Sequence, residues 1–397
     1  MTEFDCDVAV FGGGIAGLWA MQALEARGYA PVLIERHTLG GAQTLASQGI
    51  LHGGIKYALD GRVDDIALRL REMPQRWLQS IRGGGEVDLS GVGVLSDRQH
   101  LWSSGSILSK LSGALGAKML HGEVDAESRD RWPAVFQETG YRGTVRVLHE
   151  TVLDIKSVVE KFAANLQGRH FRAQGIDLQM NRGRIDGVKL HASNCQPCLL
   201  RAGFYVFAAG VGNEGAAQHM EFPQPATQRR PLRQMLVKGV PWKLYGHCLM
   251  ADPKPRVTVT THFLPDGTPV WYLGGNIAEK ACKMSEEEAF DFALREMMAV
   301  FPKIDWKRHE WASWDVDRAE PHQAVRFMPG EPTVQIRENS VLAWPTKLVF
   351  APALASKLAQ EIGNRLSPGG ASAPALTLPA AEVGKYPWEQ ATWRTLT

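Results

Sequence analysis

The stretch V-A-V-F-G-G-G-I-A-G-L-W, residues 8–19, decides the fold. Its first four residues are apolar β-formers, and apolar residues recur at helical spacing from its glycines to residue 26. Arg27 and Gly28 then supply a C-terminal cation and a glycine stop, and a second apolar run follows at residues 31–34. Strand, tight turn, helix and strand within about 30 residues make a βαβ unit.

Three glycines in this stretch, Gly12, Gly14 and Gly17, have the spacing G-x-G-x-x-G. The first allows a sharp turn, the second lets the backbone approach a pyrophosphate, and the third lets helix and strand pack closely. The helix N-terminus offers N–H groups and the positive end of its dipole to phosphates. Glu35 ends the second strand, where a carboxylate can accept hydrogen bonds from ribose hydroxyls. This combination predicts dinucleotide binding; the alternative is a tight strand–helix turn without a ligand.

The composition is that of an ordinary globular protein. The 397 residues suit two or three domains, with 44% hydrophobic and 22% charged residues. A formal net charge of +2 argues against nucleic-acid binding, which needs a clustered basic excess. The acidic N-terminus and the short apolar runs indicate neither a signal peptide nor a transmembrane segment. We therefore expect a cytoplasmic protein, with peripheral membrane contact left open; the oligomeric state is not indicated.

The five cysteines do not form a recognisable framework. Their number is odd and their spacing irregular, unlike the disulfide pattern of a secreted domain. Cys195 and Cys198 make a single C-x-x-C without the second pair of ligands that a structural zinc site needs. We expect a plain turn there and no metal; a redox or metal role is the alternative.

The remaining chain alternates between helical and strand periods. Residues 154–166 form an amphipathic helical pattern, and strand-like runs separated by turns fill residues 175–210. Residues 232–263 contain alternating segments, and the P-D-G turn at 265–267 predicts a hairpin in an antiparallel sheet. A capping box at 285–288 opens another helix, and an apolar run at 348–351 precedes the last one.

These patterns predict an α/β fold in two parts. A Rossmann-like nucleotide-binding domain, with a βαβ start, a β-meander and a closing strand and helix, would take residues 1–82, 147–220 and 333–370. An inserted α+β substrate domain, built on an antiparallel sheet, would take residues 83–146 and 221–332. Residues 371–397 would form a loosely packed C-terminal tail, because the segment from residue 367 is rich in Pro, Ala and Gly.

An ordered set of motifs resembles a known enzyme superfamily. The set is G-G-G-I-A-G with L-I-E-R, S-x-x-I-x-H-G-G-x-x-Y at 47–57, Y-V-F-A-A-G-V-G-N at 205–213, R-F-M-P at 326–329 and P-T-K-L-V-F-A-P at 345–352. In this order they resemble the FAD-dependent oxidoreductases of the D-amino-acid oxidase and glycerol-3-phosphate dehydrogenase superfamily. The H-G-G piece is most similar to the members that oxidise hydroxy compounds, such as glycerol-3-phosphate dehydrogenase and L-2-hydroxyglutarate dehydrogenase.

The resemblance implies an extended FAD and a set of residues that bind it. The glycine loop would hold the pyrophosphate, Glu35 the adenosine ribose, and the backbone near Ile176 would meet the adenine. The N-terminus of the last helix, after Pro352, would point at the pyrimidine edge of the flavin. The implied cofactor-binding residues are Gly12, Gly14, Ile15, Ala16, Gly17, Glu35, Arg36, Gln43, Thr44, Ser47, Gln48, Gly49, Ile176, Ala209, Gly210, Lys347 and Leu348.

The resemblance also implies the catalytic residues. His52 would accept the hydroxyl proton of the substrate, because histidine titrates near neutral pH; the alternatives are a loop-orienting histidine and covalent flavin attachment. Arg326 would grip an anionic group, and Lys347 would neutralise the reduced flavin or bind an acidic substrate, unless each is a surface cation. His262 and Tyr272 could face the substrate from the hairpin.

Three functions follow from these features as hypotheses. The first is FAD-dependent oxidation of a small anionic hydroxy compound, with oxygen, a quinone or another protein as electron acceptor. The second is oxidation of an amine or amino acid on the same fold. The third is a non-catalytic protein that binds a flavin or nucleotide and works through interactions.

Overall fold

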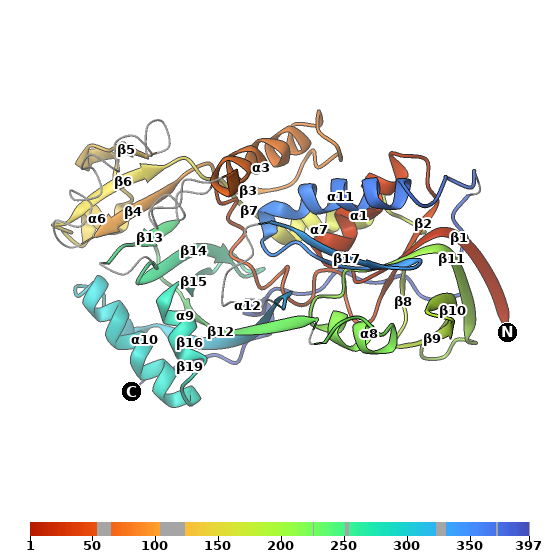
Figure 1. The fold of residues 1–397 in the computed structure, drawn as a ribbon. Helices are drawn as coiled ribbons and strands as arrows, with labels where there is room; N and C mark the ends of the chain where they lie inside the picture. The colour runs from red at the N-terminus through yellow and green to blue at the C-terminus, as the bar shows by residue number, and fades with distance from the viewer. Residues whose placement is uncertain are drawn as a thin grey trace.

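The computed structural model describes residues 1–53, 65–103, 124–224, 226–250, 254–322, 331–370 and 372–396, with side chains from residue 72 in the second of these ranges. Two lobes lie side by side, one around β1, β2 and β11 and the other around β12 to β16 (Figure 1). Within the described ranges, none of the helices has both the length and the hydropathy needed to cross a bilayer.

The first lobe is built on a mixed sheet with the strand order β17-β18-β11-β1-β2-β8, and β10 and β9 branch from β11. All pairings within the run β18-β11-β1-β2-β8 are parallel. The pairings of β17 with β18, of β10 with β11 and of β9 with β10 are antiparallel. The bounds are β1 Thr2–Phe11, β2 Pro31–Glu35, β8 His170–Arg172, β9 Gly175–Asn181, β10 Arg184–His191, β11 Cys198–Phe207, β17 Thr333–Arg337 and β18 Ser340–Trp344. The α/β fold class predicted from the glycine stretch is confirmed.

Helices cover both faces of this sheet. On one face α1 (Ile15–Glu25), α7 (Ile155–Asn165) and α11 (Ala351–Gly363) lie together, joined by the end of α3 (Asp65–Ile81) (Figure 1). The other face is covered by the β9–β10 meander and α8 (Asn213–His219). A short pair, β3 (Val94–Ser96) and β7 (Val152–Leu153), lies outside the two large sheets.

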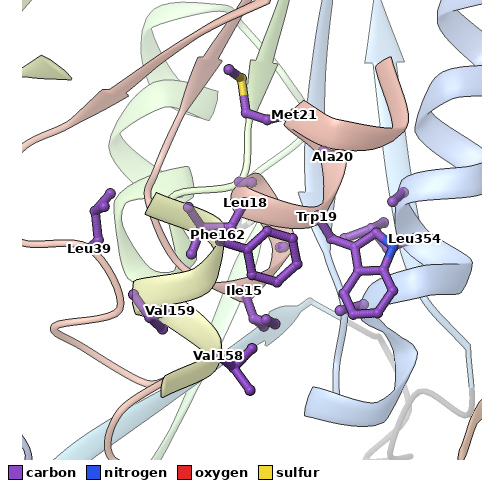
Figure 2. Close-up of a cluster of buried hydrophobic side chains, with 14 of the residues drawn as sticks. Ile15, Leu18, Trp19, Ala20, Met21, Leu39, Val158, Val159, Phe162 and Leu354 are labelled. Atoms are coloured by element: carbon purple, nitrogen blue, oxygen red, sulfur yellow. The ribbon is translucent and has the colours of Figure 1, made fainter. Parts of the chain in front are cut away.

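The core between the sheet and its helices centres on Trp19. Figure 2 shows its indole beside Leu354 of α11, with Phe162 of α7 close by. The Trp19 ring lies 4.6 Å from the ring of Trp77 in an edge arrangement and 5.6 Å from that of Phe162. All of these side chains are buried, so α1 is apolar on nearly every side and is held by packing rather than by its own propensity.

The second lobe is a sheet with the order β19-β16-β12-β15-β14-β13-β4-β6-β5. Its pairs are antiparallel except for β13 with β4. The hairpin predicted at the P-D-G turn is β14–β15, and the capping box predicted at Ser285 is present at the start of α10. The bounds are β4 Gln99–Ser103, β5 Val124–Ala126, α6 Ala134–Glu138, β6 Thr144–Leu148, β12 Thr227–Lys238, β13 Gly246–Cys248, β14 Val257–Phe263, β15 Pro269–Gly274, α9 Asn276–Ala281, α10 Glu286–Val300 and β16 Glu310–Pro321.

The C-terminal segment is packed, and the expectation of a loose tail at 371–397 is wrong. Val383 forms a bridge to Leu39, and α12 (Pro387–Gln390) carries Trp388, which is 1% exposed. The ring of Trp388 stacks on those of His262 and Tyr386 at 4.2 and 4.1 Å, and β19 (Arg394–Thr395) adds to the second sheet. The Pro-, Ala- and Gly-rich composition describes only the first residues of the segment, and the aromatic residues after them bury it against both lobes.

We predict that Trp388→Ala lowers the free energy of unfolding by about 3–5 kcal/mol, because it leaves a cavity beside the rings of His262 and Tyr386. Urea unfolding followed by circular dichroism measures this loss. Trp393→Ala is the matched control, since Trp393 is only partly buried and carries the ammonium of Lys238 over its ring at 5.0 Å. Equal losses in the two variants would contradict the anchoring role of Trp388.

Candidate functional site

The glycine loop at the end of β1 is shaped by close backbone contacts. Gly12 has a φ of +109°, and a Cβ there would lie 2.5 Å from the carbonyl oxygen of Ala208. A Cβ at Gly17 would lie 1.9 Å from the carbonyl oxygen of Gly12. No side chain fits at either position, so the steric reasons for two of the three glycines hold. Gly14 differs, because the nearest atom to its Cβ would be Thr44 Oγ1 at 3.2 Å.

The N-terminus of α1 faces this loop without a side-chain cap. Gly14 is the N-cap residue and has no side chain to accept from the first turn. The amide of Ile15 donates to Thr44 Oγ1 at 3.0 Å, and Ile15 and Ala16 are buried. The helix therefore presents amide N–H groups and its positive dipole end beside the glycine loop, an arrangement suited to a phosphate.

Glu35 lies next to the same loop. Its carboxylate accepts from the amide of Gly13 at 2.6 Å and from that of His37 at 2.8 Å. This places an acidic group at the end of β2 beside the loop, as the spacing predicts. The neighbouring Arg36 is exposed.

The loop at residues 43–49 joins the two lobes. Gln43 Oε1 accepts from the amide of Ala319 in β16 at 3.0 Å. Gln48 Nε2 lies 3.0 Å from the carbonyl oxygen of Tyr272, and the same nitrogen lies 3.3 Å from that of Thr258. These two glutamines, predicted to bind the cofactor, are engaged in holding the loop against the antiparallel sheet.

The other predicted cofactor residues lie in separate segments of the first lobe. Ser47 Oγ is buried without a hydrogen-bond partner in the described part of the chain, and Gly49 has a φ of +72°. Ala209 and Gly210 follow β11, and the amide of Ala209 donates to Asn213 Oδ1 at 2.9 Å. The remaining three are Ile176 in β9, Lys347 at the start of the 3-10 turn η4 (Leu348–Phe350) before α11, and Leu348.

A cavity of about 200 Å³ lies where the 48–52 loop meets the antiparallel sheet. Its walls carry both acidic and basic groups as well as apolar ones. The lining includes Gln48, His52, Glu150, Gln234, His247, Thr258, Gly274, Glu279 and Arg318, with Leu101, Leu148, Leu232 and Leu249 among the apolar residues.

His52 and Glu150 form a pair in this cavity. His52 Nδ1 lies 3.2 Å from Glu150 Oε2, and the side chains are 40% and 5% exposed. The buried carboxylate also accepts from the amide of Gly53 at 2.7 Å and from Gln99 Nε2 at 3.1 Å. Three donors thus fix the carboxylate, and the carboxylate fixes the orientation of the imidazole.

Arg318 supplies positive charge to the cavity from β16. Its guanidinium lies 3.9 Å from Glu279 Oε1, and its Nε donates to the carbonyl oxygen of Arg230 at 3.4 Å. Burial holds the pKa of the Arg318 guanidinium below its usual range. A half-buried guanidinium at a cavity wall can grip a carboxylate or phosphate with two N–H groups.

His262 and Tyr272 are not among the residues that line this cavity, and their place beside the substrate stays a prediction. Their strand register places them on the same sheet face as Thr258 and Gly274, which do line it. However, their end of the sheet is covered by Trp388, on which His262 stacks. Tyr272 Oη donates to the carbonyl oxygen of Ala46 at 2.9 Å. Burial lowers the pKa of His262 to about 3 and raises that of Tyr272.

Sequence reasoning missed Glu150, His247 and Arg318, which stand at separate places in the chain. Each follows or lies within a strand of the second sheet, and only the pairing of β4, β6, β13 and β16 brings them to one cavity. Arg326, predicted to bind an anion, lies outside the described residues.

Comparison with known proteins gives concordant matches. The family described as FAD dependent oxidoreductase (DAO) matches residues 7–343. A probable FAD-dependent oxidoreductase of Pseudomonas aeruginosa is 38% identical over 392 residues, which are 95% of this chain and 97% of that protein. The crystal structure of an FAD dependent oxidoreductase from Pseudomonas aeruginosa has a TM-score of 0.82 at 33% identity, covering 98% of this chain and 99% of that one.

Two more distant structures share the fold alone. Glycine oxidase from Geobacillus kaustophilus has a TM-score of 0.62 at 13% identity, covering 91% of this chain and 95% of that one. Reduced L-alpha-glycerophosphate oxidase from Mycoplasma pneumoniae, with FAD bound, has a TM-score of 0.61 at 13% identity, covering 96% and 99%.

We predict that Gly14→Ala weakens FAD binding at least about tenfold while leaving stability nearly unchanged. The new methyl group would lie 3.2 Å from Thr44 Oγ1, a contact that a shift of that side chain by a few tenths of an ångström relieves, and it projects where the backbone should approach a pyrophosphate. Flavin absorbance during titration of the apoprotein measures binding, and thermal unfolding of the apoprotein measures stability.

Gly215→Ala in α8 is the control, since a Cβ there meets nothing within 4 Å. A Gly14→Ala protein that binds FAD as tightly as the Gly215→Ala protein would show that the glycine loop does not hold the pyrophosphate.

Proposed function

The chain belongs to the DAO family of FAD-dependent oxidoreductases, and we propose that it oxidises a small anionic hydroxy compound, a 2-hydroxy acid or a polyol phosphate. Membership makes the protein an enzyme with FAD as its cofactor, so the non-catalytic hypothesis is set aside. Bound FAD would supply the hydride acceptor, flavin N5, for this oxidation. Oxygen, a quinone or another protein would take the electrons afterwards.

The residues of the first lobe fit FAD. Two glycines lie where a Cβ would collide with backbone, the N-cap residue Gly14 has no side chain to cap α1, and the buried Ser47 hydroxyl has no hydrogen-bond partner among the described residues. We assign the pyrophosphate to the glycine loop and α1, a ribose to Glu35, and the flavin side to the 47–49 loop. The N-terminus of α11 would stabilise negative charge on the reduced ring.

The observation that carries the proposal is the His52–Glu150 pair. An alcohol holds its proton until a base takes it, so oxidising a carbon–oxygen bond requires a proton acceptor beside the reacting carbon. His52 offers Nε2 to the substrate while Nδ1 faces the buried carboxylate of Glu150. Glu150 would hold the ring in one orientation and stabilise the imidazolium that forms when the proton arrives.

The anionic part of the substrate would be held by Arg318. Its guanidinium lines the same cavity as His52, and it lies at the wall formed by β16. Lys347 and Arg326 are further proposed partners for negative charge, on the substrate or on the reduced flavin. Together these cations favour a carboxylate or phosphate over a neutral alcohol.

A second function rests on the acidic side of the cavity. Glu150 and Glu279 both line it, and carboxylates can accept hydrogen bonds from a substrate ammonium while Arg318 binds the carboxylate. This arrangement would suit an amino acid or amine. An ammonium must lose a proton before hydride can leave, and His52 could accept that proton as well, so the two functions are distinguished by which compounds reduce the flavin.

The proposal predicts which compounds reduce the bound flavin under anaerobic conditions. A panel pairs each 2-hydroxy acid with the 2-amino acid of the same carbon skeleton and adds glycerol phosphate. Bleaching of the flavin absorbance by hydroxy compounds, faster than by their amino partners, is the expected result. Reduction by the amino partners alone would overturn it in favour of the second function.

A further inference from the structure

Three side chains from separate segments converge at one end of the cavity. His52 follows the lobe-joining loop, Glu150 follows β6, and His247 lies in β13. One donor atom from each lies within 4.8 Å of the other two, and the rings of His52 and His247 are 5.9 Å apart. Glu150 and His247 are buried at 5% and 7% exposure. We propose that these three residues form a binding site for a divalent first-row transition metal ion.

The donor set suits such an ion. Two imidazole nitrogens and one carboxylate oxygen are borderline ligands, preferred by Zn²⁺ and Fe²⁺ over Mg²⁺ or Ca²⁺. Metal–donor bonds of about 2.0–2.2 Å place neighbouring donors roughly 3.0–3.4 Å apart. The 3.2 Å between His52 Nδ1 and Glu150 Oε2 already has this value, and the third donor, on His247, lies within 4.8 Å of both and has to move closer to join them.

Surrounding hydrogen bonds orient two of the three ligands. His247 Nδ1 lies 2.8 Å from Thr258 Oγ1, so when Nδ1–H donates there, Nε2 carries the lone pair for the metal. The carboxylate of Glu150 is held by the amide of Gly53 and by Gln99. Partners of this kind fix tautomer and rotamer around protein-bound metals.

Exposed pairs elsewhere lack this arrangement. His149 with Asp125 and His191 with Asp177 are contacts of 2.9 and 2.8 Å at the surface, each with two donors. Within the described ranges, the group of His52, Glu150 and His247 is the one in which at least three such donors meet. A third ligand and burial separate it from an ordinary surface pair.

The remaining coordination positions face the cavity. Three protein ligands leave room for water or for an anionic ligand, as in metal sites that bind substrates or inhibitors. His52 and Glu150 are also the pair to which we assign proton acceptance, so a bound ion would occupy the base. Metal binding itself is independent of the proposed function, whereas inhibition by the metal rests on it.

Titration of the chelator-treated, FAD-loaded enzyme with Zn²⁺ tests the site by calorimetry. We expect one ion per chain, with the Kd raised at least about tenfold in Glu150→Gln and in His247→Gln. His149→Gln is the matched control and should bind as the wild type does. Visible circular dichroism of the flavin confirms that each variant is folded, and His247→Asn replaces His247→Gln if that variant is not.

Wild-type enzyme without a stoichiometric site, or a folded His247 variant with the wild-type Kd, would overturn the proposal. The titration contains no substrate, so its result stands whether hydroxy or amino compounds reduce the flavin. In a second measurement, saturating Zn²⁺ should slow flavin reduction at least about tenfold, with recovery on adding a chelator. Unchanged reduction with Zn²⁺ bound would contradict the shared use of His52.

Discussion

The loop at residues 43–49 is held between the two lobes by hydrogen bonds to one sheet, and the cavity depends on this contact. The side-chain Nε2 of Gln48 donates to the carbonyl oxygen of Tyr272 at 3.0 Å, and the carbonyl of Ala46 accepts from the Tyr272 hydroxyl at 2.9 Å. A few residues later the same chain carries His52, which reaches Glu150 of the second lobe. The attachment of the loop therefore sets the position of the imidazole relative to the sheet, and with it the relation between the cofactor lobe and the cavity.

The fold does not identify the substrate, because related scaffolds act on different compounds. The glycine oxidase and the L-alpha-glycerophosphate oxidase resemble this chain to nearly the same degree, with TM-scores of 0.62 and 0.61. Discrimination between hydroxy and amino substrates has to come from the side chains at the cavity wall. His52, held by the buried carboxylate of Glu150, is suited to accept a hydroxyl proton. Arg318, which lines the same cavity from β16, is suited to bind a negatively charged group. Glu279, beside Arg318, is a carboxylate that could bind the ammonium group of an amino substrate.

The glycine loop could be predicted from the sequence because steric rules fix the spacing of its glycines. Several cavity residues could not be predicted, because pairing between distant strands brings them together. Gly17 is required by a contact with Gly12 inside one βαβ unit, and the spacing to Glu35 follows from the same unit, whereas the contact that requires Gly12 is with Ala208 at the end of β11. Glu150 and His247 meet only through the register of distant strands, which no short motif encodes. Strand register puts His262 on the same face of the sheet as Thr258, but alternation in the sequence does not show that Trp388 covers that end. The average composition of residues 371–397 predicts a loose tail, whereas the aromatic residues that pack this segment, such as Tyr386 and Trp388, all lie in its second half.

The central claim is that the His52 imidazole accepts the substrate proton, and chemical rescue tests it most directly. Anaerobic flavin reduction by the best hydroxy substrate is followed in His52→Ala, with and without added imidazole. The account predicts a rate at least about a hundredfold below that of the wild type, rising with imidazole concentration while the flavin stays bound. A His52→Ala enzyme that reduces its flavin at the wild-type rate would contradict the account.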